Sequence, residues 1–260
     1  MVSQEPHVLR RDDSGIVTLT LNRPAKLNPL SEDMLAALQE TWDDLSEDKS
    51  ARVIIIQGAG RAFCAGHYLN EMRANPDFDY QQRLFRTCSE TMLSIVKLPQ
   101  PVIAKVHGIA TAAGCQLVAS CDLAIASEDA RFAASGVNIG LFCSTPCVAL
   151  SRNVSRKHAL ELLMTGEFIT APRAFELGLL NHVVPADELD ATTLALATAL
   201  LSKSPGVLAA GKRTFYRQLE MGISDAYDFA SSEMARGMMT PDAAEGIDAF
   251  IEKREPVWPE

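Results

Sequence analysis

Four short segments of the chain carry the hydrophobic patterns of β-strands. Residues 16–21 alternate apolar and polar positions and are rich in β-branched side chains. Residues 53–57, 102–106 and 123–126 are nearly continuous apolar runs, which are typical of strands buried on both faces. Helical patterns lie between these segments. Strands that alternate with helices predict an α/β fold with largely parallel pairing.

Helical periodicity is clearest between the first two strands. Ser31 is placed to cap a helix whose apolar side chains recur at i, i+3 and i+4 as far as Leu45. A second helix is expected over about residues 80–96, and it should stop before Pro99. These two helices are expected to pack on one sheet.

The pattern changes after about Ser144, because strand signals nearly vanish apart from residues 182–184. Helices are expected over 187–201, 207–221 and 223–238. Thr240 followed by proline marks the start of a last helix. The C-terminal part of the chain is therefore expected to be helical, and to pack on the α/β core or on a neighbouring subunit.

Composition excludes some classes of function. The 260 residues include 24 Lys and Arg against 33 Asp and Glu, a net charge of −9, which argues against an extended nucleic-acid interface. The most apolar stretch, residues 102–126, is interrupted by Lys105, His107, Gln116 and Asp122, so no membrane span is expected there. The start of the chain lacks the apolar region of a secretory signal.

The cysteines predict neither a zinc site nor a disulfide framework. They lie in apolar segments and form no paired Cys-x-x-Cys motifs, so no metal is expected. The six are Cys64, Cys88, Cys115, Cys121, Cys143 and Cys147. Reduced thiols that pack as small core residues favour a cytosolic, and thus cytoplasmic, protein.

Two loops rich in small residues each follow a predicted strand. The first spans residues 58–69, and the second spans 107–117 and leads into a helix expected to begin near Ala113. Tight packing alone explains the first loop equally well. However, small residues let another group approach the backbone, and a helix N-terminus presents unpaired N–H groups. If the loops converge, two N–H donors would hold a carbonyl oxygen as it gains negative charge.

Motifs in both loops resemble those of the crotonase (enoyl-CoA hydratase/isomerase) family. They are Ala-Phe-Cys-Ala-Gly-His at 62–67, Ala-Ala-Gly-Cys at 112–115 and Cys-Asp-Leu-Ala-Ile-Ala at 121–126. Residues 21–28, 165–166 and 174–179 extend the resemblance over nearly the whole chain, in the family's order. It implies an α/β crotonase (ClpP-like) spiral of ββα units over residues 1–201. A helical region over 202–260 would then form homotrimers or hexamers.

The resemblance also implies a substrate, an acyl-CoA thioester. Two backbone N–H groups, those of His67 and Ala113, would form the oxyanion hole that stabilises the enolate-like charge. Coenzyme A is part of the substrate, so no separate cofactor is expected. Its binding residues would be Ala25, Lys26, Leu27, Ala62, Cys64, Ala65, Gly66, Tyr68 and Leu69, with Phe250 and Lys253 from a neighbouring subunit. On a protein of charge −9, Lys26, Arg61 and Lys253 are candidate partners for the CoA phosphates.

Three positions depart from the family pattern. The two glutamates with which hydratases activate water would fall at Gln116 and Gly136, and neither residue titrates. Tyr68 replaces the Asp that usually follows the oxyanion residue. The usual acid–base pair is therefore absent, although the motifs of the oxyanion hole and the CoA groove are present.

Replacement groups near these positions are expected to be structural. We expect the His67 imidazole to pack, and His107 to be a hydrogen-bonded structural histidine. Cys143 lies where a relative, naphthoate synthase, has an Asp, but a buried thiol without a base is usually inert. Asn138 and Gln116 can orient water but cannot take up a proton at neutral pH.

Three functions remain open. The first is an enoyl-CoA hydratase/isomerase-type enzyme with altered acid–base machinery. The second is other enolate chemistry on acyl-CoA, by a decarboxylase, a C–C bond enzyme or a thioester hydrolase. The third is a non-catalytic acyl-CoA-binding protein that has kept the groove.

Overall fold

The computed structural model describes residues 5–259. Its centre is a six-stranded sheet in the order β1-β2-β3-β4-β6-β9, in which only the β1–β2 pair is antiparallel. The strands are β1 (Val8–Asp13), β2 (Ile16–Leu21), β3 (Val53–Gly58), β4 (Val102–Val106), β6 (Leu123–Ser127) and β9 (His182–Val184). A smaller sheet joins β5 (Ile109–Thr111), β7 (Arg131–Ala133) and β8 (Ile169–Thr170).

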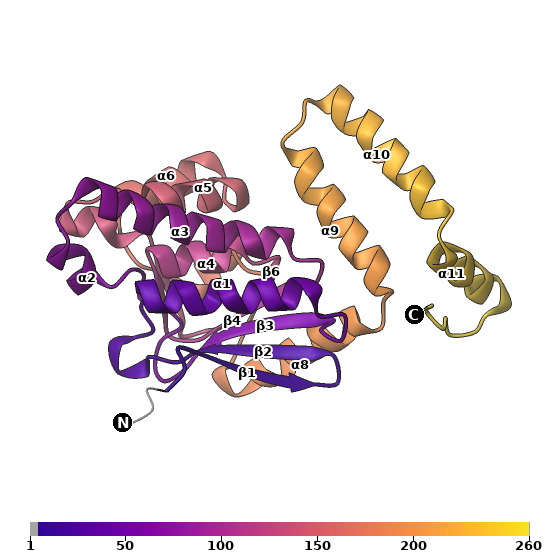
Figure 1. Cartoon of the computed structure of the whole chain (residues 1–260), viewed down its shortest axis with the longest axis horizontal. Coiled ribbons are helices and arrows are strands. Elements are labelled where there is room, and N and C mark those ends of the chain that lie inside the picture. The colour runs from indigo at the N-terminus through magenta and orange to yellow at the C-terminus, as the bar shows by residue number, and fades with distance from the viewer. Residues whose placement is uncertain (1–4, 260) are drawn as a thin grey trace.

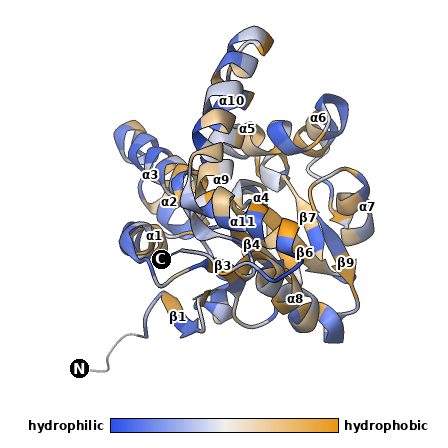
Figure 2. Ribbon diagram, turned by 90° about the vertical axis from the view of Figure 1, so that its right-hand side faces the viewer, coloured by the Kyte–Doolittle hydropathy of each residue, from blue (hydrophilic) through white to orange (hydrophobic). Residues whose placement is uncertain are grey.

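Helices cover both faces of the large sheet. On one face lie α1 (Glu32–Glu47), α3 (Phe78–Lys97) and α4 (Ala113–Ser120), whose apolar side chains join those of the strands in the main core. On the other face, α8 (Leu189–Leu201) packs on a second, smaller cluster. Figure 2 shows α8 and α4 on opposite sides of the strands. The sheet is therefore the middle of three layers, as an α/β sequence pattern predicts.

The remaining helices are either short helices that connect these elements or the helices of the C-terminal part of the chain. They are α2 (Leu69–Ala74), α5 (Ser144–Asn153), α6 (Arg156–Thr165) and α7 (Ala171–Glu176), with 3₁₀ turns η1 (Pro24–Lys26), η2 (Ser135–Ile139) and η3 (Ala186–Glu188). The last three helices are α9 (Pro205–Leu219), α10 (Ile223–Met238) and α11 (Pro241–Glu252). We call residues 205–252 the arm. Figure 1 shows the arm reaching away from the layers to one side.

Most predicted elements are confirmed. All four expected core strands form, and so does the strand at 182–184. Ser31 caps α1 by accepting a hydrogen bond from the Met34 N–H at 3.2 Å, and Thr240 caps α11 in the same way from Ala243. The helix expected from residue 207 begins two residues earlier, because Ser204 caps it and proline follows at the first helical position.

Strand β1 was missed by the sequence reasoning, which saw only a polar segment there. The reason is that β1 is an edge strand, and all of its side chains except that of Val8 are exposed. The part of that segment before Glu5 lies outside the described residues. Strands β5, β7 and β8 are two or three residues long, which is too short to leave a periodic pattern.

Between Glu5 and Pro259, no single helix is long and apolar enough to span a membrane. Residues 186–201 and 205–219 reach that length and composition only together, across a 102° bend. No group of three or more His, Cys, Asp or Glu side chains in the same range is arranged to hold a metal ion. The division of the chain at residue 201 falls between α8 and α9, and a separate C-terminal unit stays a prediction.

Candidate active site

The two small-residue loops of the sequence meet side by side. The Cys64 N–H donates to the Ile109 carbonyl at 3.0 Å, and the Thr111 N–H donates to the Cys64 carbonyl at 3.0 Å. These bonds form a parallel bridge between Cys64, in the loop after β3, and Ala110, the middle residue of β5. The loop after β3 is thereby aligned with β5, and the chain enters α4 directly afterwards.

Glycine makes this contact possible, because the loops touch through their backbones. A Cβ atom on Gly114 would lie 2.2 Å from the Cys64 carbonyl oxygen, and one on Gly108 would lie 2.2 Å from that of Arg61. A Cβ atom on Gly66 would lie 3.0 Å from the Thr111 oxygen and 3.3 Å from the Ala113 nitrogen. The small residues serve first to let one loop approach the other.

Two of the backbone N–H groups at this junction that have no acceptor in residues 5–259 are the expected donors of the site. They belong to His67, which follows Gly66, and to Ala113, the first residue of α4. Ala112, just before it, has φ +51° and ψ −119°, a conformation that costs a non-glycine residue on the order of 1–3 kcal/mol. The expected convergence of the loops is therefore present, together with backbone strain beside one donor.

A third segment holds the first loop in place through Asn28, which sequence reasoning did not assign to the site although it placed the preceding residues 25–27 in the CoA groove. Asn28 is fully buried, and its amide donates to the carbonyls of Ala59 and Ala62 at 2.8 Å and of Phe63 at 3.3 Å. Its Oδ1 accepts from the Arg23 N–H at 2.9 Å. Asn28 also adopts φ +51°, which asparagine tolerates better than most residues. Its place in the family-like motif at 21–28 was the available signal.

The backbone on either side of Asn28 adds two bonds to the loop. The Ala65 N–H donates to the Leu27 carbonyl at 3.0 Å, and the Leu30 N–H donates to the Gly66 carbonyl at 2.8 Å. Segments from three parts of the chain thus fix the residue that precedes His67.

The His67 imidazole points into the protein. Its Nδ1 lies 3.2 Å from the Leu30 carbonyl oxygen, and its ring packs edge-on against Phe85 of α3 with 5.4 Å between centroids. A carbonyl only accepts, so Nδ1 carries the hydrogen. Burial lowers the pKa of His67 and favours the neutral ring. The expected packing role agrees with this arrangement. His107 is likewise hydrogen-bonded, with Nε2 2.7 Å from the Gly60 carbonyl oxygen.

The nine residues of this region that are expected to line the CoA groove differ in their exposure to solvent. Ala62, Cys64 and Gly66 are buried, so only their backbone is available near the surface. Ala25, Lys26 and Leu69 are exposed, and Leu27, Ala65 and Tyr68 are partly exposed. The structure brings these residues to one region through the bonds of Leu27, Ala65 and Gly66 described above.

Tyr68 and Lys26 form a pair at this surface. The Lys26 ammonium lies 4.5 Å from the centre of the Tyr68 ring, and Asn70 donates to the Tyr68 hydroxyl at 3.2 Å. Hydrogen bonding to Lys26, more than to Asn70, lowers the pKa of the Tyr68 phenol. A cation and an aromatic face therefore lie beside the exposed part of the loop that ends in His67.

Phe250 and Lys253 are not brought to this region within one chain. They lie at the end of α11, at the tip of the arm, whereas Tyr68 leads into α2 at the opposite end of Figure 1. Phe250 is 84% exposed. The sequence analysis expects these two residues to complete the CoA site of a neighbouring subunit. Their separation from Tyr68 within one chain is compatible with that expectation.

Gln116 and Gly136 have contrasting surroundings. Gln116 is 4% exposed, and its side-chain oxygen has no hydrogen-bond partner in the described chain. Gly136 has no room for a side chain, since a Cβ atom would lie 2.3 Å from the Leu141 oxygen and 2.8 Å from the Cys143 sulfur. The space beside Gly136 is therefore filled by its own loop.

The candidate replacement groups are held by structural bonds. The Cys143 sulfur accepts from the Gly136 N–H at 3.3 Å, and burial raises the pKa of this thiol. The Asn138 amide donates to the Gly166 carbonyl at 3.1 Å. Sequence reasoning missed one polar pair here: the hydroxyls of Thr111 and Ser135 lie 2.8 Å apart and connect the loop before Ala113 with the one before Gly136.

Comparison with known proteins assigns the class. The family model described as enoyl-CoA hydratase/isomerase matches residues 11–260. The chain belongs to this family, and the resemblance noted in the sequence is confirmed.

Individual relatives make the assignment more specific. The mitochondrial enoyl-CoA hydratase domain-containing protein 3 of Xenopus laevis is 47% identical over 253 residues, 97% of this chain and 86% of that protein. A crystal structure of an enoyl-CoA hydratase from Mycobacterium smegmatis is 56% identical, with a TM-score of 0.96 over 98% of this chain and 99% of that one. That of human enoyl-CoA hydratase domain-containing protein 3 is 46% identical, with a TM-score of 0.92 over 97% and 100%. The expected crotonase fold is thereby confirmed.

One expectation is contradicted. Reduced, scattered cysteines suggested a cytosolic protein, whereas relatives from frog, mouse and human are named mitochondrial. Free thiols argue against an oxidising compartment, but they do not distinguish one reducing compartment from another. The prediction of a cytosolic protein was wrong for this reason.

Proposed function

We propose that this protein binds an acyl-CoA thioester and stabilises its enolate-like form with the backbone N–H groups of His67 and Ala113. The observation that carries the proposal is that both groups lack an acceptor in residues 5–259 and lie close to Gly66, since His67 follows it and a Cβ atom on it would be 3.3 Å from the Ala113 nitrogen. A thioester oxygen placed between them would gain two hydrogen bonds that strengthen as its charge develops. The N-terminus of α4 adds the positive end of a helix dipole.

The exposed pair of Lys26 and Tyr68 supports a binding place for coenzyme A. Lys26, with Arg61, would neutralise phosphates, and the aromatic face of Tyr68 would contact the nucleotide or the pantetheine chain. Leu69, 51% exposed, adds apolar surface. No other cofactor enters this proposal, since coenzyme A is part of the substrate.

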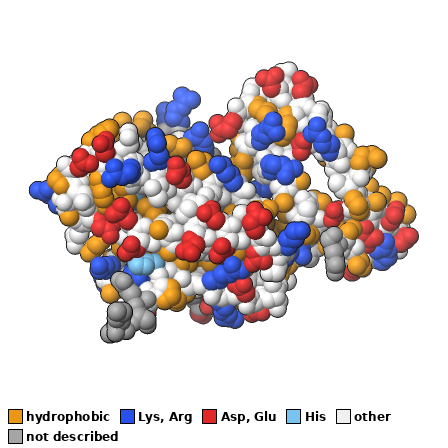
Figure 3. All heavy atoms as spheres, viewed as in Figure 1, with side chains coloured by type: hydrophobic (Ala, Val, Ile, Leu, Met, Phe, Trp, Pro, Cys, Tyr) orange, Lys and Arg blue, Asp and Glu red, His pale blue; other side chains and the backbone are white. Residues whose placement is uncertain are grey.

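We also propose a homotrimer, alone or paired into a hexamer. The arm carries exposed apolar side chains that a second copy would cover, among them Ile223 (79% exposed), Met239 (85%) and Phe250 (84%). In such an assembly, Phe250 and Lys253 of one copy would reach the CoA site of the next. Figure 3 shows apolar side chains along this part of the surface.

The reaction that we favour is of the enoyl-CoA hydratase/isomerase type, which for hydration is a lyase reaction. The names of the relatives support this class. Gln116 and Gly136 replace the glutamates of that mechanism, so the proton must pass through water or the substrate itself. The Gln116 amide would hold that water by hydrogen bonds and would not take its proton.

The direct test is incubation with a panel of 2-enoyl-CoA thioesters and detection of the water adduct by mass spectrometry. We expect an adduct with at least one chain length. Ala113→Pro, which removes the N–H, should abolish it, whereas Ala113→Gly keeps the N–H and should retain activity. His67→Ala should keep most activity, because its N–H remains. If no chain length gives an adduct, hydration is the wrong reaction.

A second candidate is other enolate chemistry, by a decarboxylase or a thioester hydrolase. It is favoured by the closed loop at Gly136, which has no room for a carboxylate side chain. Malonyl-type and β-keto thioesters, followed by product analysis, distinguish it from hydration. Calorimetric binding of acyl-CoA without turnover of any of these compounds would instead identify a non-catalytic acyl-CoA-binding protein.

A further inference from the structure

Lys212 of α9 is a buried cation that joins the arm to the core. Its side chain is 7% exposed. The ammonium donates to the carbonyls of Ile95 at 2.8 Å and Gln100 at 2.9 Å, and to Oδ2 of Asp122 at 2.6 Å. All three donors of the ammonium are thus used on groups of the core. Such complete pairing offsets the cost of removing a charge from water.

Asp122 is held by the arm a second time. Its Oδ1 accepts from the Tyr216 hydroxyl at 2.8 Å, and its Oδ2 also accepts from the Val102 N–H at 2.7 Å. Lys212 and Tyr216 are four residues apart and so lie on the same face of α9. We call Lys212, Asp122 and Tyr216 the latch.

The latch lies at the far end of the helix that begins with Ala113. Helix α4 ends at Ser120, two residues before Asp122, and all eight of its residues are buried. A helix of that length spans about 12 Å as a rigid rod. Its N-terminal end is the Ala113 N–H, so the position of Asp122 constrains the direction of that donor.

The latch also holds the helix that touches His67. Ile95 belongs to the last turn of α3, and the same helix carries Phe85, whose ring packs on the His67 imidazole. One ammonium therefore contacts the last turn of α3 and the residue that follows α4 by two positions. Helix α4 begins with the Ala113 N–H, and α3 packs on the side chain of His67.

We propose that Lys212 is a positioning residue for the proposed oxyanion hole. Through Asp122 and Ile95 it fixes α4 and α3 relative to each other, so that the N–H groups of Ala113 and His67 point at one oxygen. The inference rests on the proposed function, and it makes the arm a part of the site within its own chain. A latch that only anchors the arm would leave recognition of the thioester oxygen unchanged.

The test compares two ligands that differ only in that oxygen, butyryl-CoA and its thioether analogue S-butyl-CoA. Dissociation constants are measured by calorimetry for the wild type, Lys212→Met and Tyr216→Phe. The control is Arg213→Met, which removes an exposed cation of the same helix whose one ion pair within residues 5–259 is with Glu233 of the arm, at 3.7 Å. We expect the wild type to bind butyryl-CoA at least tenfold more tightly than the thioether.

In Lys212→Met that preference should fall to about twofold, while the affinity for S-butyl-CoA stays within about twofold of the wild type. Tyr216→Phe, which keeps the ammonium, should lose about threefold of the preference, and Arg213→Met should lose none. If Lys212→Met does not fold, the Tyr216→Phe result decides. Equal weakening of both ligands, or an unchanged preference, overturns the positioning role.

Failure of the proposed function gives a different result, because the wild type itself would then show no preference for the thioester oxygen. Hydrogen–deuterium exchange gives a readout that needs no ligand. Amides at residues 116–120, which are hydrogen-bonded in α4, should exchange faster in Lys212→Met than in Arg213→Met. Unchanged exchange at these positions contradicts the coupling through α4.

Discussion

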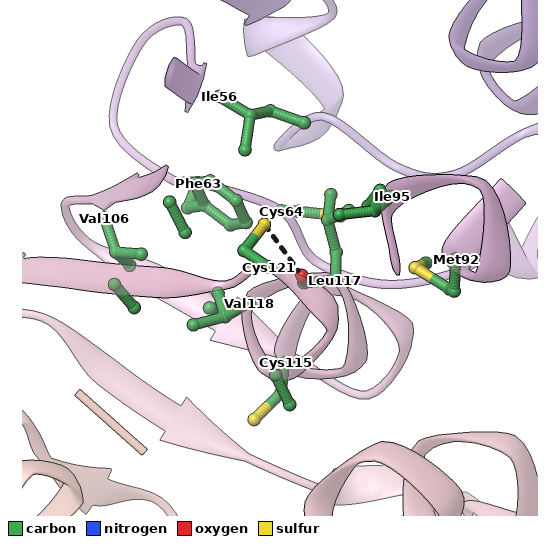
Figure 4. Close-up of a cluster of buried hydrophobic side chains, with 14 of the residues drawn as sticks. Ile56, Phe63, Cys64, Met92, Ile95, Val106, Cys115, Leu117, Val118 and Cys121 are labelled. Atoms are coloured by element: carbon green, nitrogen blue, oxygen red, sulfur yellow. Dashed lines mark hydrogen bonds between the residues drawn. The ribbon is translucent and has the colours of Figure 1, made fainter. Parts of the chain in front are cut away.

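Helix α4 and the helices of the arm are held in place in opposite ways. All eight residues of α4 are buried, whereas every residue of α9 and α10 keeps some exposed surface, although the Lys212 side chain is only 7% exposed. Helix α11 has one buried residue, Ala249. Figure 4 shows the dense packing around α4, where the Cys121 thiol donates to the Leu117 carbonyl at 3.3 Å. Close packing on every side determines where α4 lies.

The arm, in contrast, is placed by a few polar contacts. Lys212 and Tyr216 join it to Asp122, and Trp258, just beyond it, donates to the Ser202 carbonyl at 2.8 Å. Its apolar side chains face outward in the single chain, as Tyr227 (73% exposed) and Met234 (71%) show. Helix α4 is therefore stabilised by packing within the chain, whereas the arm presents apolar surface to a partner.

The largest effect of a single substitution expected from this contrast follows the addition of one methyl group to α4. Gly114→Ala would place a Cβ atom 2.2 Å from the Cys64 carbonyl oxygen, and neither backbone has room to move. We expect a loss of about 3 kcal/mol in the free energy of unfolding, measured by urea denaturation. It would also separate the two loops of the site. A loss below about 1 kcal/mol would show that the α4 contact is looser than described.

Alkaline pH should weaken the core through its buried cysteines, a residue type that the arm does not contain. Burial raises the pKa of Cys64, Cys88 and Cys115 to about 12 each, against about 9 in the unfolded chain. From pH 9 to 12 the unfolded state therefore binds fewer protons, and the free energy of unfolding falls as pH rises, by up to about 1.4 kcal/mol per pH unit for each thiol. Urea titrations at several pH values measure this slope.

A matched pair of variants isolates one thiol. The alkaline slope should be shallower in Cys88→Ala, which removes a buried thiol, than in Cys147→Ala, which removes a partly exposed thiol of α5. Equal slopes in the two variants would contradict the role of burial.

Relief of backbone strain should have a smaller effect of opposite sign. Ala112→Gly allows φ +51° and ψ −119° without a Cβ penalty, and we expect a gain of about 1 kcal/mol in unfolding free energy after the entropy of glycine is subtracted. Freedom at this position should also reduce the preference for butyryl-CoA over S-butyl-CoA. Ala119→Gly, within α4, should instead destabilise by about 1 kcal/mol. A lower free energy of unfolding for Ala112→Gly than for the wild type would show that the backbone at Ala112 is not strained.

The smallest effect is expected in the arm. A Cβ atom on Gly237 of α10 would meet no atom within 4 Å, so Gly237→Ala should stabilise the protein by about 0.5 kcal/mol through helix propensity. Gly211→Ala in α9 provides a second open position. Thermal unfolding measures both. If both Gly→Ala variants unfold at a lower temperature than the wild type, at protein concentrations that favour assembly, the two positions contact a partner copy.

Local sequence signals predicted much of the fold. Apolar runs marked β3, β4 and β6, because a strand buried on both faces needs apolar residues at every position. Hydroxyl side chains marked the starts of α1 and α11, since a cap acts within three residues. The family-like motifs located both loops of the site. Edge strand β1 was missed, because its pairing leaves little trace in an exposed segment.

The amino-acid sequence by itself determined which segments become strands, helices and small-residue loops, because those preferences act over a few neighbouring residues. Only the tertiary structure decided which backbone atoms meet. Gly66 lies against Ala113, Asn28 binds carbonyls more than thirty residues away, and Lys212 reaches Asp122 across ninety residues of chain. Such contacts arise where whole layers pack together, and the direction of an N–H group depends on all of them at once.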